Sequence, residues 1–99
     1  MKTICVNISN YTGDLDLVYI GRPSKWGNPF KVGRDGNNTE CKEKYREYIK
    51  NRKDLLDSLD ELKGRALGCW CKPKDCHGDV LVELIEEDLW KLFLDYDYA

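Results

Sequence analysis

Residues 68–79 read GCWCKPKDCHGD and contain three of the five cysteines of this 99-residue chain together with its single histidine. Thiolate sulfur and imidazole nitrogen are the ligands that zinc prefers in proteins, and a thiol beside an imidazole can also act as a nucleophile with its base. Cys69 and Cys71 are one residue apart, and Cys76 and His77 are adjacent. Structural zinc sites usually place two to four residues between paired ligands, so this spacing is a poor match to zinc.

Three interpretations of this segment remain open. The first is a zinc site whose ligands are Cys69, Cys71, Cys76 and His77, and we rank it last because of the spacing. The second is a catalytic group with Cys76 as nucleophile, His77 as general acid or base and Asp79 as the residue that orients it. The third needs neither a metal nor a reactive thiol.

In the third interpretation, the last helix of the chain begins between Cys76 and Asp79 and binds an anion. The first amides of a helix lack partners inside the helix and carry a partial positive charge, which favours phosphate or carboxylate. Gly78 would let the backbone approach the ligand closely. The alternative without function is that Cys69 and Cys71 are small buried residues and that His77 or Asp79 caps the helix.

A second segment with functional character is IGRPSKWGNPFKVGRDG, residues 20–36. Long irregular loops in small domains are uncommon and are usually functional, and this one follows a predicted strand. Arg22 offers a planar fork of donors for phosphate, and Trp26 and Phe30 offer rings for stacking on a base. Together with the first segment, it predicts a ligand site at Gly21, Arg22, Lys25, Trp26, Gly27, Asn28, Phe30, Trp70, Cys76, His77, Gly78 and Asp79. The alternative is a packed loop whose rings fill the core.

The elements that position these segments follow from the periodicity of apolar residues. Alternation predicts strands over residues 3–8, 15–20 and 65–71. Helical spacing predicts a helix from Asn37 or Thr39 to about Ile49, a second over residues 54–62, and a last one with an apolar stripe. That stripe consists of Leu81, Leu84, Ile85, Leu89, Leu92 and Phe93. The order predicts one small α/β domain, with a short sheet of three or slightly more strands covered by about three helices.

Composition narrows the function class. The chain is 41% hydrophobic and 34% charged with a net charge of −2, which predicts a folded protein with no overall attraction to duplex nucleic acid or anionic membranes. No apolar run reaches the roughly 20 residues that span a bilayer. We therefore expect a cytoplasmic protein with reduced thiols, since five cysteines cannot all pair. Residues 86–98 form an acidic, tyrosine-containing tail that we expect to continue the last helix.

Three stretches of the sequence, IGRPSKWGNPF, EKYREYI and GCWCKPKDCHGD, together resemble the domain of unknown function 4326 family, whose members occur in bacteria and phages. The resemblance extends from about Val18 to Leu84. The family often has an arginine near the start of the first helix, where this chain has residues 37–40, NNTE. Its signature positions here are Gly21, Arg22, Gly27, Asn28, Pro29, Phe30, Cys69, Trp70, Cys71, Pro73, Cys76, His77, Gly78 and Asp79.

The resemblance implies a shared site without naming its chemistry. We expect a small protein that binds a phosphate-bearing nucleotide, or a ligand derived from one, between residues 22–30 and residues 76–79. The alternatives are a hydrolase or transferase acting on such a ligand, and an interaction module stabilised by zinc. For the nucleotide-binding protein we expect no cofactor. A phage-encoded member would work in the cytoplasm of the host.

Overall fold

The computed structural model describes residues 2–87, and Met1 and residues 88–99 lie outside the described part. All but the first two residues of the predicted acidic tail, and Leu89, Leu92 and Phe93 at the end of the apolar stripe, therefore also lie outside it. No helix in the described part is both long enough and apolar enough to cross a membrane.

Three short parallel strands form the sheet, in the order β1-β3-β2. They are β1 (Ile4–Asn7), β2 (Leu17–Tyr19) and β3 (Ala66–Cys69). Ala66 is level with Ile4 on one side and with Leu17 on the other. All four residues of β3 are buried, as expected of the central strand of a parallel sheet. The three predicted strands are confirmed, although each is shorter than predicted.

Within residues 2–87, four helical segments accompany the sheet: α1 (Asn38–Lys50), α2 (Lys53–Asp57), the 3₁₀ helix η1 (Leu59–Leu62) and α3 (His77–Glu86). The predicted helix over residues 54–62 is broken in two at Ser58. The Ser58 hydroxyl donates a hydrogen bond to the Asp54 carbonyl (3.0 Å), a local bond of the kind that bends helices. Gly64, with φ +75°, follows η1 in a conformation that suits glycine.

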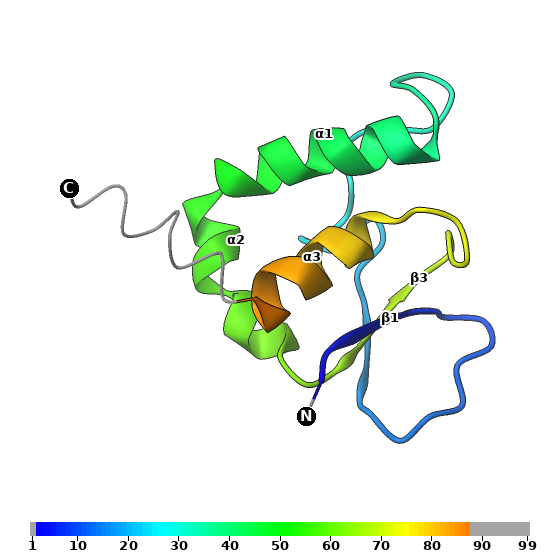
Figure 1. Cartoon of the computed structure of the whole chain (residues 1–99), viewed down its shortest axis with the longest axis vertical. Coiled ribbons are helices and arrows are strands. Elements are labelled where there is room, and N and C mark those ends of the chain that lie inside the picture. The colour runs from blue at the N-terminus through cyan, green and yellow to red at the C-terminus, as the bar shows by residue number, and fades with distance from the viewer. Residues whose placement is uncertain (1, 88–99) are drawn as a thin grey trace.

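Helix α3 lies between the sheet and α1 (Figure 1) and contacts β1, β3 and α1. Its buried residues Val80, Leu81, Leu84 and Ile85 face this interior. Helix α1 presents Cys41, Tyr45 and Ile49 to the same interior, as its spacing predicts. The sheet, α3 and α1 therefore form successive layers around one core, and the small α/β domain predicted from the sequence is confirmed.

The loop between β2 and α1 is held down by α1. The Tyr45 hydroxyl donates a hydrogen bond to the Trp26 carbonyl (2.9 Å), and the Asn28 side-chain amide donates to the Cys41 carbonyl (3.2 Å). The Asn28 side-chain oxygen also accepts from the Phe30 amide (2.9 Å). These bonds fix the loop beside the start of α1.

Asn37 begins α1 as a reciprocal cap, in which its side-chain oxygen accepts from the Glu40 amide (2.8 Å) and the Glu40 carboxylate accepts from the Asn37 amide (3.0 Å). We predict that Asn37→Ala lowers the free energy of unfolding by about 1 kcal/mol, because the Glu40 amide loses its partner. Urea denaturation followed by circular dichroism measures this. Asn10→Ala, in the exposed turn after β1, is the control, and equal midpoints for the two variants would contradict the capping role.

Candidate functional site

A cleft of ≈ 560 Å³ opens where the two predicted functional segments meet. It lies beside the carboxyl ends of β2 and β3, the edge at which open α/β sheets commonly bind ligands. Its lining comes from the end of β2, the loop after it, the start of α1, and the segment that joins β3 to α3. The lining residues are Tyr19, Gly21, Arg22, Asn28, Phe30, Lys31, Val32, Asn38, Cys41, Lys42, Cys69, Trp70, Cys71, Asp75, Cys76 and His77.

Three cations line this cleft, and they differ in their partners. The Lys42 ammonium lies 3.8 Å from Asp75 and 3.9 Å from Asp79, so its charge is partly neutralised. Within residues 2–87, no carboxylate lies at salt-bridge distance from the side chains of Arg22 or Lys31. The cleft therefore has positive charge available at its loop wall.

Aromatic side chains give the cleft flat surfaces. Trp70 follows β3 and is 64% exposed, which is unusual for so large an apolar group. Phe30 is half-buried and meets Tyr48 edge-on, with ring centroids 6.3 Å apart. The Tyr19 hydroxyl donates to the Arg22 carbonyl (2.7 Å), and the Tyr19 ring lies against Gly21, where any side chain would collide with it. Trp70 is the ring best placed to receive a ligand.

Five residues predicted to bind the ligand do not line the cleft, and three of them, Lys25, Trp26 and Gly27, belong to the loop after β2. Trp26 is only 3% exposed and belongs to the hydrophobic core, so its ring cannot stack on a base without unfolding the loop. Lys25 forms a salt bridge with Glu61 (2.7 Å). Gly27 packs against the backbone of Arg22, where a β-carbon would come within 3.0 Å. The structure gives these three residues partners outside the cleft and does not support the predicted ligand contacts.

The start of α3 is already occupied by groups of the chain itself. Cys76 is the N-cap, and its sulfur accepts a hydrogen bond from the Gly78 amide (3.4 Å). The Asp79 carboxylate accepts from the Cys76 amide (3.3 Å) and forms a salt bridge with Lys72. The Gly78 amide bonds to the Cys76 sulfur and the Asp79 amide to the Cys76 carbonyl (3.0 Å), so the structure does not support the predicted binding of an anion by Gly78 and Asp79.

Gly78 instead allows close packing inside the protein. A β-carbon at this position would lie 2.5 Å from the Cys5 sulfur and 2.7 Å from the Ile20 Cδ1. Glycine is needed here because the sheet approaches the helix, and the prediction that it lets a ligand approach is not supported.

His77 is a buried, neutral histidine. Its Nε2 lies 2.8 Å from the Ile20 carbonyl, which can only accept, so Nε2 carries the proton. Burial lowers the pKa of the imidazole, and its ring packs edge-on against Tyr45 with centroids 4.9 Å apart. The other nitrogen, Nδ1, lies 3.6 Å from the Cys76 sulfur. His77 therefore joins the start of α3 to the end of β2 and to α1.

The catalytic group suggested by the sequence gains no support from this geometry. Cys76 is 2% exposed, and hydrogen bonding with Cys5 and Cys69, together with burial, raises the pKa of its thiol. A nucleophilic cysteine needs the opposite shift. The Asp79 carboxylate contacts Lys72, Lys42 and the Cys76 amide. The catalytic interpretation instead required it to orient His77.

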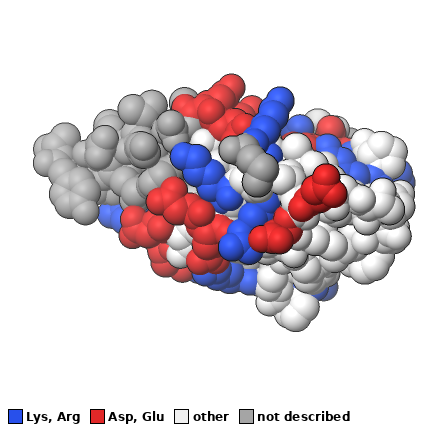
Figure 2. All heavy atoms as spheres, turned by 90° about the horizontal axis from the view of Figure 1, so that it is seen from below, with Lys and Arg blue, Asp and Glu red and all other residues white. Residues whose placement is uncertain are grey.

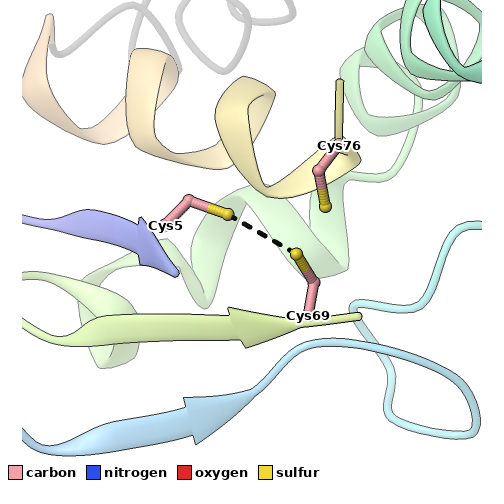
Figure 3. Close-up of side chains that lie close together, drawn as sticks. All are labelled: Cys5, Cys69 and Cys76. Atoms are coloured by element: carbon pink, nitrogen blue, oxygen red, sulfur yellow. Dashed lines mark hydrogen bonds between the residues drawn. The ribbon is translucent and has the colours of Figure 1, made fainter. Parts of the chain in front are cut away.

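The sulfurs of Cys5, Cys69 and Cys76 lie within 4.8 Å of one another and could hold a metal ion. Figure 3 shows them pointing toward one another from β1, the end of β3 and the start of α3. The Cys5 and Cys69 sulfurs are 3.9 Å apart. This set differs from the predicted zinc ligands, because Cys5 is included and Cys71 and His77 are not. Cys5 could have been found only from the position of β1 beside β3, which the sequence did not give.

The charged surface is mixed. On the face seen in Figure 2, Lys and Arg side chains alternate with Asp and Glu, and an uncharged area lies to one side. That face therefore has no extended basic surface of the kind that binds nucleic acid duplexes.

We predict that Gly78→Ala lowers the free energy of unfolding by about 1–3 kcal/mol, because the new methyl group collides with the Cys5 sulfur and with Ile20. In an ordinary helix the same change is favourable by about 1 kcal/mol. Urea denaturation of Gly78→Ala, Cys5→Ala and the double variant measures the coupling. The double variant should recover part of the loss, and a stabilised Gly78→Ala protein would contradict the packing role.

Comparison with known proteins places the chain in a family. The family model described as "Domain of unknown function (DUF4326)" matches residues 6–87. An "Uncharacterized 12.4 kDa protein in nrdA-td intergenic region" of Enterobacteria phage T4 is 35% identical over 97 residues, covering 93% of this chain and 83% of the relative. "Uncharacterized protein R718" of Acanthamoeba polyphaga mimivirus is 37% identical over 99 residues, covering 82% and 72%. No solved structure matches.

Both curated relatives are viral, which agrees with the occurrence in phages expected from the motifs. The match contains both walls of the cleft and two of the three cysteines whose sulfurs converge, Cys69 and Cys76. The third, Cys5, immediately precedes the first matched residue. This chain belongs to the DUF4326 family of domains of unknown function.

Proposed function

We propose that the protein binds a phosphate-bearing nucleotide, or a small molecule derived from one, in the cleft between the loop after β2 and the segment before α3. The observation that carries this proposal is the coincidence of Arg22, without a carboxylate partner among residues 2–87, and the exposed ring of Trp70 in one cleft. A cation and an aromatic surface are the two elements that a nucleotide needs.

The phosphate end of the ligand would meet the loop wall. Arginine presents a planar fork of donors that matches two phosphate oxygens at once, and Lys31 adds a second charge in the same lining. Lys42, which already shares its charge with two carboxylates, contributes less. The proposed contact therefore comes from the loop. In this respect it differs from the sequence-based expectation, which also used the amides of Gly78 and Asp79.

The base end would stack on Trp70. Stacking of a base on an aromatic side chain contributes about 1–3 kcal/mol and tolerates different bases. The cleft volume of ≈ 560 Å³ also lies in the range of roughly 300–1,000 Å³ that is usual for small-molecule sites. We propose binding in preference to turnover, because Cys76 is buried and His77 is held by the Ile20 carbonyl.

We predict that Arg22→Ala weakens nucleotide binding at least about tenfold, the loss expected when a hydrogen bond to a charged group is removed. The probes are adenosine, AMP, ADP and the 5′-monophosphates of guanosine, cytidine and uridine, titrated into ¹⁵N-labelled protein. The dissociation constants come from amide shift changes. Lys25→Ala is the matched control, because it removes the same charge from the same loop but from a side chain that pairs with Glu61 outside the cleft.

Trp70→Ala should weaken all the probes by a similar factor, roughly 5–150-fold, because stacking does not read the base. The exposed position of Trp70 means that this change leaves the core intact. AMP should bind more tightly than adenosine by the contribution of its phosphate. Equal affinities of Arg22→Ala and Lys25→Ala, or no shift at the cleft amides with any phosphorylated probe, would show that the proposal is wrong.

A further inference from the structure

We propose that Cys5, Cys69 and Cys76 bind a single Zn²⁺ ion as a three-thiolate site between the sheet and the start of α3. This site differs from the predicted ligand set and stands independently of any ligand in the cleft. It joins Cys5 of β1 to Cys69, 64 residues later in the sequence, and to Cys76 at the start of α3 (Figure 3).

The spacing of the three sulfurs suits a zinc ion. Zinc–sulfur bonds of about 2.3 Å in a tetrahedron place two sulfurs about 3.8 Å apart. The Cys5 and Cys69 sulfurs are 3.9 Å apart, and all three sulfurs lie within 4.8 Å of one another. Side-chain rotations that move each sulfur by about 1 Å or less would complete the three bonds, so the backbone is already arranged for the ion.

A second observation points in the same direction: a backbone amide donates to one of these sulfurs. The Gly78 amide donates to the Cys76 sulfur (3.4 Å). Amide donors around ligand sulfurs are a recurrent outer shell of metal–thiolate sites, because they stabilise the anionic form.

Without a metal, these thiols can form only weak hydrogen bonds to the backbone and to one another. The Cys69 thiol can donate to the Val6 carbonyl (3.7 Å), and Cys5 and Cys69 can share a proton between them. Three thiolate charges within 4.8 Å of one another would repel, and a divalent cation removes that repulsion.

The charge balance favours zinc over a monovalent soft ion. Three thiolates around Zn²⁺ leave one negative charge, whereas three around Cu⁺ leave two in a largely buried place. Lys72, whose ammonium pairs with Asp79, adds a positive charge near Cys5 and Cys76.

The simpler alternative is that the three cysteines are small apolar residues that fill the space under α3. The two interpretations differ in what the reduced wild-type protein does with metal. A packing role predicts no defined complex with zinc, whereas the proposed site predicts one ion per chain. A site of three sulfurs would also bind Co²⁺, and the complex would give an intense thiolate-to-cobalt charge-transfer band.

The experiment is a titration of reduced, metal-free protein with Co²⁺ and then with Zn²⁺ in competition with a chromophoric chelator. We expect one equivalent to bind with a charge-transfer band, and Cys5→Ser to weaken binding at least about tenfold. Cys41→Ser is the matched control, because Cys41 is also a buried free cysteine but lies outside the cluster. Circular dichroism checks that each variant is folded.

A measurement on the wild-type protein keeps the proposal testable if Cys5→Ser does not fold. X-ray absorption of the zinc-loaded chain should show three or four sulfurs at about 2.3 Å. Fewer than three sulfurs, no zinc binding by the folded reduced protein, or equal affinity of folded Cys5→Ser and Cys41→Ser would overturn the proposal. Loss of binding in Cys71→Ser with full binding in Cys5→Ser would overturn this ligand set in favour of one drawn from residues 69–77.

Discussion

The contact of the first turn of α3 with the sheet is the interaction on which the rest of the structure depends. Gly78 has no side chain, and this lets the turn settle onto Cys5 of β1 and onto Ile20 after β2. His77 reinforces the same contact through its hydrogen bond to the Ile20 carbonyl. Because Tyr45 of α1 packs on the imidazole and also holds Trp26 of the loop, one turn of helix connects all the layers.

The two functional segments, residues 20–36 and 68–79, therefore contain both supporting residues and residues that face the cleft. Trp26, Asn28 and Gly27 fix the loop from within, and the N-cap of Cys76 with Asp79 fixes the start of α3. The loop and the helix start in turn hold Arg22 and Trp70 at the two sides of one hollow. Most residues of these two binding-like motifs therefore hold the backbone in place, and only a few of them are exposed in the cleft.

The sequence predicted the elements well, because alternation in residues 3–8 and helical spacing in α1 and α3 are local signals. It could not predict that β3 lies between β1 and β2, since strand order depends on packing between distant segments. Cys5 was missed for that reason: its sulfur meets Cys69 only when β1 is the neighbour of β3. Trp26 and Asp79 were assigned to the ligand because charge and aromaticity do not reveal whether a side chain already has a partner inside the protein. Tyr45 and Lys72 supply those partners.

The central position of β3 also has a consequence for how the chain folds. Ile4 and Leu17 both pair with Ala66, so neither outer strand has its neighbour until two-thirds of the chain has been synthesised. Pairings of such long sequence separation are slow to form, because the closure of a long loop precedes any gain from contacts. The strand that completes the sheet leads directly into Trp70 and Cys76. The cleft and the sulfur cluster therefore come into existence in the same step as the sheet, and a nascent chain has neither before then.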